Sequence, residues 1–457
     1  MKPPALWRDW LAIACIGLGT AVVPLDSAVN IAFPDITRSF GIELHQIQWV
    51  VIAYVLTHAS LMMLFGRIGD RVGRRRVFGL GLIWSTVAFI ALSLAPSFEW
   101  LLAGRVAQGV GAALIGACGP ALITGLAAEE RRARMLGLYM LMFGVGMALG
   151  PSLGGLMVEL VGWPGVYGMR VPLCLLALAL VWSLPPGTPS RSRTGRGDIN
   201  VAGAVLLATT MAALLFTANR LQLAGSAPWI PAGLAVLTAA LLGLLFWHEG
   251  RARAPILPVS LLRHATFSGV ITANSLVAFA GFSIMLLVPY FLANLTTLAV
   301  TGAGLVLACS PLGTVGVSIV AGRLIERLGA RRVAALAAGF TAVGLVGIGL
   351  WPAHPSVLSM IVPLFLAGAG LGLFQIASMD VITGSMRMEE RGVAGSLAQV
   401  SRTVGVMTAA SLLSLAFGLL GGGQGVPSSV FLEAFSGLFL SVAVLPALVA
   451  ILMATRR

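Results

Sequence analysis

The chain has 457 residues, of which 58% are hydrophobic and only 10% are charged, and its mean hydropathy is +0.97. A soluble globular domain has roughly a quarter charged residues, so this composition excludes a soluble domain and indicates an integral membrane protein. The net charge of +13 would suggest nucleic-acid binding in a soluble chain. Here the basic residues lie almost entirely in short segments between apolar stretches, and no nucleic-acid partner is expected.

Fourteen apolar stretches of the sequence are long enough to cross a bilayer, whose core needs about 20 residues per helix. They lie near residues 10–33, 47–66, 77–95, 99–125, 135–158, 165–184, 199–219, 228–247, 267–292, 299–322, 332–351, 357–379, 393–420 and 430–453. The first is too long for the apolar part of a typical signal peptide and is interpreted as a retained helix. Without the seventh and eighth stretches the count would be twelve, and either even number places both termini on one side.

The basic residues assign the two sides of the membrane. The termini and the segments after the even-numbered stretches hold 24 of the 29 Lys and Arg residues. Because basic residues are concentrated in cytoplasmic loops, this distribution predicts that both termini are cytoplasmic. We expect a multi-pass protein of the inner cell membrane.

A twelve-residue pattern occurs twice, each time between two apolar stretches. It reads GRIGDRVGRRRV at 66–77 and GRLIERLGARRV at 322–333, and seven positions are identical. A duplicated basic turn points to two membrane halves that arose from one ancestral unit. The turns follow the second and tenth stretches, so two stretches are inserted between the halves. The expected organisation is an N-terminal six-helix bundle at 1–184, a linker with two inserted helices at 185–258, and a C-terminal six-helix bundle at 259–457.

Four motifs in this order carry a family resemblance. They are LDSAVNIAFPDI at 25–36, GRIGDRVGRRRV at 66–77, RVAQGVGAAL at 105–114 and GVGMALGPSLGG at 144–155. Together they resemble the major facilitator superfamily, specifically its fourteen-helix branch of drug/proton antiporters, and the resemblance extends over the whole chain. It implies an all-α integral membrane protein with the major facilitator fold: two six-helix bundles plus two inserted helices, working by alternating access.

The loop motif at 66–77 has two interpretations. Its two glycines permit a tight turn, and its acid can face a helix N-terminus, where the helix dipole favours an anion. The resemblance implies that this turn is a gating loop that latches the two halves on the cytoplasmic side. The alternative is that its arginines only fix the topology. The gating-loop candidates are Gly66, Asp70, Arg71, Gly73 and Arg74.

The motif at 144–155 predicts a smooth and kinkable helix face. Proline removes a backbone hydrogen bond, and glycines four residues apart admit a close neighbour. The resemblance implies an antiporter hinge that controls leakage during alternating access, and tight packing alone is the alternative. The hinge candidates are Gly146, Gly150, Pro151, Gly154 and Gly155.

Ionisable residues inside a membrane are costly and are functional candidates. Asp26 and Arg105 lie at nearly the same depth below the outer ends of the first and fourth stretches. The resemblance places both stretches beside a central cavity, so Asp26 is a candidate protonatable carboxylate, with a fixed ion pair to Arg105 as the alternative. Arg402 lies near the middle of the thirteenth stretch and completes this group of proton-coupling and substrate candidates.

Two further candidates depart from the family pattern. Arg170 stands where the family usually has Asn and adds one positive charge to the outer cavity, or else its side chain extends to the outer interface. His58 places an imidazole midway along the second stretch, where relatives favour apolar residues. It is a possible proton relay, although a hydrogen-bonded packing role is more common for a lone membrane histidine.

The sequence favours transport over catalysis. It contains no His/Cys/Glu metal cluster and no glycine-rich phosphate loop after a strand, so no metal, cofactor or enzymatic activity is expected. The expected function is proton-coupled export of amphipathic small molecules of the multidrug-efflux type. Because three arginines face one deep carboxylate, transport of an anionic amphiphile or lipid is an alternative, and a non-transporting membrane sensor or scaffold is another. The expected partners are the substrate, protons and the bilayer, and the chain is expected to be a monomer.

Overall fold

A computed structural model describes residues 16–126, 132–183, 200–221, 229–252, 265–384, 391–421 and 426–455. Within these ranges every regular element is a helix, which confirms the all-α prediction. In a bilayer only helices and closed barrels satisfy all backbone hydrogen bonds internally, so a helical chain of this hydropathy fits a membrane protein.

The first predicted span is a broken helix. Residues Ile16–Ile31 contain a short 3-10 turn, η1 (Pro24–Ser27), followed by α2 (Ala28–Ile31), and the chain then bends by 60° into α3 (Phe33–Phe40). The apolar stretch that was predicted to end near residue 33 stops at this bend. The separate helix α3 beyond it was not predicted, because it is amphipathic: its outward face carries Asp35 and Arg38, which form a surface ion pair of 2.7 Å.

The remaining helices follow the predicted order. The N-terminal group continues with α4 (Leu44–Val72), α5 (Arg74–Ser93), α6 (Phe98–Leu126), α7 (Arg132–Val161), α8 (Gly165–Gly168) and α9 (Arg170–Ser183). Next come α10 (Val201–Leu221) and α11 (Trp229–Arg251). The C-terminal group consists of α13 (Ala265–Leu295), α14 (Val300–Leu328), α15 (Ala330–Gly349), α16 (Val357–Gly384), α17 (Arg391–Leu419) and α18 (Ser428–Thr455).

Each of the fourteen predicted stretches falls on one of these helices or on a broken helix. In the described ranges, ten helices are long and apolar enough to cross a membrane, or eleven if the bent first segment is one span. The chain is therefore a multi-pass membrane protein. The count of fourteen crossings and the predicted domain boundaries stay predictions.

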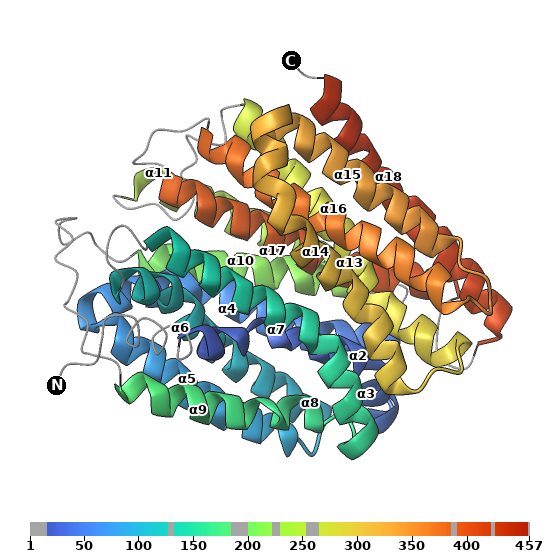
Figure 1. Ribbon diagram of the computed structural model, residues 1–457, viewed down its shortest axis with the longest axis horizontal. Coiled ribbons are helices and arrows are strands. Elements are labelled where there is room, and N and C mark those ends of the chain that lie inside the picture. Colours follow the sequence, from blue (N-terminus) through green and yellow to red (C-terminus); the bar gives the residue numbers. More distant parts are fainter. Residues whose placement is uncertain are drawn as a thin grey trace.

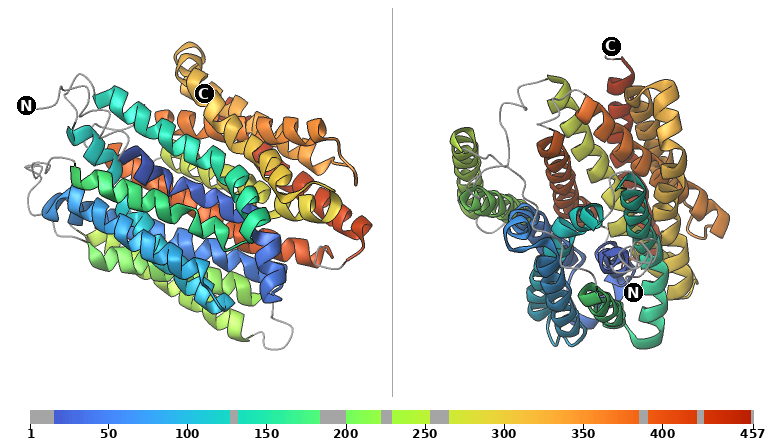
Figure 2. Two further views of the ribbon diagram at one scale, coloured as in Figure 1. Left: turned by 60° about the horizontal axis from the view of Figure 1, so that its bottom comes forward. Right: turned by 60° about the vertical axis from the view of Figure 1, so that its left-hand side comes forward.

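The helices form two groups that lie side by side (Figure 1). One group contains α2 to α9, in blue to green, and the other contains α13 to α18, in yellow to red. The pair α10 and α11 lies at the edge of the molecule (Figure 2), and α10 packs against both α4 and α17. A hydrogen bond of 2.9 Å between Thr217 and Thr238 joins the two helices of this pair.

The duplicated turn has the same geometry in both groups. Gly73 lies between α4 and α5 with φ +110°, and Gly329 lies between α14 and α15 with φ +84°. Such positive φ values favour glycine because it lacks a Cβ atom. The prediction that Gly66 also forms the turn is wrong: Gly66 lies inside α4, well before that helix ends.

Equivalent arginines of the two turns bind equivalent helices. The Nε–H group of Arg75 donates to the carbonyl oxygen of Val181 near the end of α9, at 3.0 Å. Arg331 follows the second glycine by two residues, just as Arg75 follows the first. Its Nε–H group donates to the carbonyl oxygen of Met453 near the end of α18, at 3.2 Å. The last carbonyls of a helix lack partners within the helix, and a cation suits that end of the helix dipole. Each turn thus fixes the sixth helix of its own group.

We expect Arg75→Gln and Arg331→Gln each to lower the free energy of unfolding by about 1–2 kcal/mol, since each removes a charged donor from a helix end. Thermal unfolding of the purified protein in detergent measures the effect. The neighbouring exposed residues supply matched controls, and Arg76→Gln and Arg332→Gln should change stability by less than about 0.5 kcal/mol. Equal losses in all four variants would show that only the basic charge of the loop matters.

Candidate functional site

Asp26 lies in the 3-10 turn η1 of the broken first span. Pro24 begins this turn, and its fixed φ and missing N–H suit the first position of a helix. A 3-10 segment in the middle of a helix often marks a functional hinge. The turn directs the Asp26 carboxylate toward α6 and α9, and 15% of this side chain remains exposed.

Arg105 of α6 binds Asp26 through both carboxylate oxygens. Its Nη1 donates to Oδ1 at 2.6 Å and its Nη2 to Oδ2 at 2.8 Å. Its Nε–H donates to the carbonyl oxygen of Val50 on α4 at 2.7 Å. Gln108 lies one turn further along α6, accepts from Arg105 at 2.6 Å and donates to Asp26 at 2.8 Å. Arg105 is only 1% exposed, so this bidentate pair joins the first span, α4 and α6 inside the protein.

Arg170 at the start of α9 is a second partner of the same carboxylate. Its Nη1 donates to Asp26 Oδ1 at 3.0 Å and its Nη2 to the carbonyl oxygen of Leu25 at 2.9 Å. The residue is 0% exposed. The alternative in which Arg170 extends to the outer interface is therefore wrong.

Asp26, Arg105, Gln108 and Arg170 form a cluster, called the Asp26 cluster below, which carries two positive charges and one negative charge. Aromatic faces lie against both cations: the ring of Tyr54 is 4.5 Å from Arg105, and the rings of Phe89 and Tyr167 are 5.2 and 5.8 Å from Arg170. The face of an aromatic ring attracts a cation. These rings therefore help to stabilise the one positive charge that the single carboxylate does not neutralise. Protonation of Asp26 would remove the negative charge that three guanidinium hydrogen bonds share and leave a neutral, weaker acceptor. A bound proton therefore weakens this arrangement of the arginines.

His58 lies one turn beyond Tyr54 on α4, and the two rings stack with centroids 5.9 Å apart. Its Nε2 atom is buried and has no hydrogen-bond partner among the described residues. His58 therefore extends the contacts of the Asp26 cluster through Tyr54 but does not bind Asp26 itself. The proton-relay interpretation stays a prediction.

Arg402 is not part of this cluster. It lies on α17, partly buried, and makes no hydrogen bond or ion pair within the described part of the chain. The sequence predicted that three arginines face the Asp26 carboxylate. In the structure, Arg105 and Arg170 bind it and Arg402 does not.

The gating-loop residues are only partly described. The side chain of Asp70 lies outside the described part of the structure, and Arg71 is exposed. Arg74 donates to the carbonyl oxygen of Ala121 on α6 at 3.2 Å, a contact within its own helix group. The predicted cytoplasmic latch between the halves therefore stays a prediction.

The hinge candidates are buried where α7 meets two other segments. A Cβ atom at Gly154 would lie 2.7 Å from the carbonyl oxygen of Ala28, and Gly146 and Gly150 likewise face the broken first span. A Cβ at Gly155 would lie 2.6 Å from the carbonyl oxygen of Val300, in the first turn of α14. The close packing of these glycines is thus present, and α7 continues as one helix through Pro151. The hinge motion stays a prediction.

At the end of the molecule that the charge pattern predicts to be outside, hydrogen bonds join the two helix groups. The Glu159 carboxylate, near the end of α7, accepts from the backbone N–H of Thr301 at 3.2 Å and from its hydroxyl at 2.6 Å. Thr301 lies in the first turn of α14, where the helix dipole favours an anion. The hydroxyls of Thr37 on α3 and Tyr290 on α13 are 2.8 Å apart and buried.

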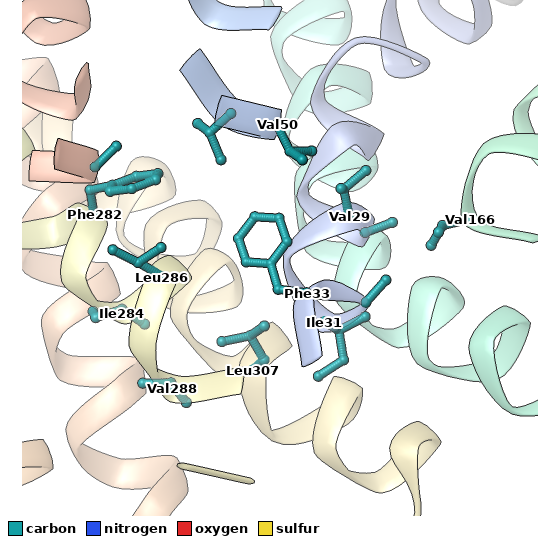
Figure 3. Packing of buried hydrophobic residues seen from close by; sticks show 14 of the residues in the cluster. Val29, Ile31, Phe33, Val50, Val166, Phe282, Ile284, Leu286, Val288 and Leu307 are labelled. Carbon is teal, nitrogen blue, oxygen red and sulfur yellow. The ribbon is translucent and has the colours of Figure 1, made fainter. Parts of the chain in front are cut away.

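An apolar layer lies behind these hydrogen bonds. The ring of Phe33 is completely buried and lies between its own segment and the helices that carry Leu286 and Leu307 (Figure 3). Leu286 belongs to α13 and Leu307 to α14, so residues of both groups meet here. Together the polar and apolar contacts hold the two groups against each other at the predicted outer end.

Several of these residues were absent from the sequence analysis. Gln108 has a local signal, because it lies three residues after Arg105 and such residues are neighbours on a helix. Glu159 and Thr301 have no such signal, since 142 residues separate them. Tyr54 reads in the sequence as one more apolar position of a span.

Comparison with known proteins adds the family. The Major Facilitator Superfamily model matches the chain twice, over residues 10–271 and 270–457. The chain belongs to this superfamily. The multidrug resistance protein Stp of Mycobacterium tuberculosis is 30% identical over 86% of this chain and 73% of its own length. The riboflavin transporter RibZ of Clostridioides difficile is 27% identical over 87% of this chain and 86% of its own length.

Solved structures support the same fold. A bacterial homologue of the lysosomal transporter Spinster, in an inward-facing and unoccupied conformation, matches 99% of this chain and 97% of its own, with a TM-score of 0.70 at 17% identity. The expected major facilitator fold is confirmed, whereas membership of the fourteen-helix drug/proton branch stays a prediction. The relatives are transporters rather than enzymes. In the described ranges, no three His, Cys, Asp or Glu residues lie together as metal ligands would.

The shared carboxylate predicts a specific pattern of stabilities. Asp26→Asn leaves two buried arginines without a counter-charge, so we expect a loss of about 3–5 kcal/mol of unfolding free energy. Arg170→Gln should cost less because the bidentate pair with Arg105 remains. The double variant Asp26→Asn/Arg170→Gln has one buried arginine without a counter-charge instead of two. Its loss of unfolding free energy should therefore be smaller than the sum of the two single losses. Thermal unfolding in detergent gives the three values, and strictly additive losses would contradict the shared ion pair.

The exposed pair of Asp35 and Arg38 provides the control for this cycle. Surface ion pairs contribute about 0–1 kcal/mol, so Arg38→Gln should change stability little. A large effect of this substitution would mean that any loss of basic charge destabilises the protein in the assay.

The contact between Glu159 and Thr301 predicts a change in conformation. Glu159→Gln removes the charge at the start of α14, which is worth about 0.5–1 kcal/mol, and should raise the open-to-closed ratio of the predicted outer end about two- to fivefold. Distances between spin labels at Glu99 and Ser356, in a background without native cysteines, report this ratio.

Glu43→Gln is the matched control, because Glu43 caps α4 within its own helix group. An unchanged label distance distribution in Glu159→Gln, or the same shift in both variants, would show that the Glu159 contact does not hold the outer end closed.

Proposed function

We propose that this protein is a proton-coupled antiporter that exports amphipathic small molecules from the cell by alternating access. It works as a monomer in the inner membrane with both termini in the cytoplasm. The bundles at 1–184 and 259–457 move relative to each other, and residues 185–258 connect them and supply the two inserted helices. No cofactor takes part.

The observation that carries this proposal is the Asp26 cluster. A carboxylate in the interior of a span is costly unless it has a use or a partner, and Asp26 has two guanidinium partners at once. It joins the broken first span to α6 and α9, and α7 packs on the same span. A change of its charge therefore acts on the segments that contact the other helix group.

The proposed cycle links protonation to these contacts. With Asp26 ionised and bound by Arg105 and Arg170, the outer end is closed and substrate enters from the cytoplasm. A proton that reaches Asp26 from the outside loosens its pairing with both guanidinium groups, the glycine-lined face of α7 slides on the first span, and the contact of Glu159 with α14 opens. Substrate then leaves to the outside. When the protein returns to its inward-open state, Asp26 releases the proton to the cytoplasm, and this release restores the pair.

The relatives support the cargo class in general terms. Stp is named a multidrug resistance protein and RibZ a riboflavin transporter, and both names denote small molecules. Transport of an anionic amphiphile or lipid is the second candidate, favoured by the excess of buried arginines. A non-transporting sensor or scaffold is the candidate from another class, and it would not need the Asp26 carboxylate.

Proton flux in inside-out vesicles tests the proposal. Addition of cationic, neutral or anionic amphiphiles to energised vesicles should dissipate the pH gradient, measured with a pH-sensitive acridine dye. Asp26→Asn should abolish the substrate-dependent flux because no carboxylate remains to bind the proton. The double variant with Arg170→Gln, which leaves one buried arginine without a counter-charge instead of two, should be equally inactive per folded molecule.

Asp35→Asn is the matched control. Asp35 is a partly exposed acid on the continuation of the same span, and its loss should leave the flux unchanged. Substrate-dependent flux that survives in folded Asp26→Asn would refute proton coupling through Asp26. The absence of any flux with the unmodified protein across the panel would favour the sensor or scaffold.

A further inference from the structure

The charges inside the two helix groups do not balance. Asp26 is bound by Arg105 and Arg170, which are almost completely buried and therefore closed to a ligand in this conformation. The third arginine of the interior, Arg402, has no hydrogen bond or ion pair in the described ranges and is partly buried. Arg402 is thus the interior cation that the protein leaves available.

Its position keeps Arg402 away from both membrane surfaces. It lies eleven residues after Arg391 and seventeen before Leu419, the two ends of α17. At 1.5 Å per residue these separations are about 16 and 26 Å, which is longer than an arginine side chain can span.

The contacts of α17 also fix its rotation. Ser401 accepts a hydrogen bond from Asn274 of α13 at 2.8 Å, and its carbonyl oxygen accepts one from Ser275 at 2.8 Å. Gly405, one turn later, packs on the backbone of Ser275. Successive residues of a helix are rotated by about 100°, so Arg402 lies beside the face that meets α13 and not on it.

The sequence offers no carboxylate at this depth in the C-terminal group. From residue 265 onward, Glu326, Asp380 and Glu433 lie near the ends of α14, α16 and α18, and Glu389 and Glu390 precede the first residue of α17 in the sequence. An arginine inside a membrane needs a counter-charge, polar partners or water, and the described part of the C-terminal group provides no carboxylate at this depth.

We propose that Arg402 is a binding subsite for an anionic group, a carboxylate or phosphate, on an amphipathic ligand. The planar guanidinium group matches the two oxygens of such an anion. Val406, one turn along the same face and partly buried, suits the apolar part of the ligand. Only the assignment of this ligand as cargo rests on the proposed export function, and the binding itself needs no proton gradient. The charge preference therefore resides at Arg402, whereas Arg170 is engaged with Asp26.

A matched pair of probes tests this subsite. Purified full-length protein in non-ionic detergent is titrated with 11-(dansylamino)undecanoic acid and with its neutral methyl ester, and dansyl fluorescence gives both Kd values. Arg402→Gln should raise the Kd of the acid by about tenfold or more, as expected for loss of a charged hydrogen bond, and leave that of the ester nearly unchanged. Arg402→Lys, which keeps the charge but not the planar donor pair, should give an intermediate Kd.

The control variant is Arg251→Gln, since Arg251 is exposed and lies over the ring of Trp247 at 4.5 Å, at the end of α11. It should bind both probes as the unmodified protein does. Equal losses for acid and ester, or an unchanged Kd for the acid in Arg402→Gln, would overturn the proposal. So would an unmodified protein that does not prefer the acid, a result that requires no variant to fold.

Two sources of the anion are separated by competition. Displacement of the bound acid by phosphatidylglycerol but not by phosphatidylcholine, with no flux of the acid in vesicles, assigns the subsite to an anionic lipid. Flux of the acid that depends on Arg402 assigns it to cargo. Failure of proton coupling through Asp26 would leave the binding result intact, so the two proposals fail independently.

Discussion

The arrangement of the N-terminal helices depends on one carboxylate shared by two buried arginines. Asp26 comes from the first span, Arg105 from α6 and Arg170 from α9, so three separate segments meet at a single negative charge. In the low-dielectric interior an unpaired charge is far more costly than in water. The three segments are therefore held together in this conformation for as long as the carboxylate stays ionised.

The packing around this cluster explains how a local charge could affect a distant contact. The same broken span that carries Asp26 lies against the glycine face of α7, where no side chain larger than hydrogen fits beside Ala28. Gly155, the next residue after Gly154, packs on α14, and Glu159, one turn further along α7, binds Thr301 of α14. Closely packed helices shift between discrete arrangements rather than deforming continuously. A change at Asp26 thus has a short physical route to the boundary between the helix groups.

The sequence predicted the helices well because hydropathy and helix length are local properties. Hydropathy did not predict α3, because the polar residues on one face of this helix interrupt the apolar stretch. The sequence also assigned Gly66 to the turn, whereas Gly66 lies inside α4, and this assignment depends on where that helix ends. Residue counting along two spans was enough to expect Asp26 and Arg105 at one depth. The same counting put Arg170 in the outer cavity but left the outer interface as an alternative, because the choice between them depends on how the start of α9 is packed against the first span. The bond between Glu159 and Thr301 joins segments 142 residues apart, and no single-sequence pattern reports such a pair.

The two helix groups share the geometry of the duplicated turn but differ in the charged residues of their interiors. The turn geometry is kept: Arg75 and Arg331 follow equivalent glycines and bind the sixth helix of their own group. The charge cluster is not kept, because the helices equivalent to the first span, α6 and α9 are α13, α16 and α18, and their interiors carry no charged residue. The interior charge of the second group is instead Arg402 on α17, which has no equivalent carboxylate. The scaffold is thus repeated while the charges are not, and this asymmetry gives one half a compensated carboxylate and the other an uncompensated cation. In the proposed cycle the compensated carboxylate binds the proton, and the uncompensated cation is the proposed subsite for an anionic group.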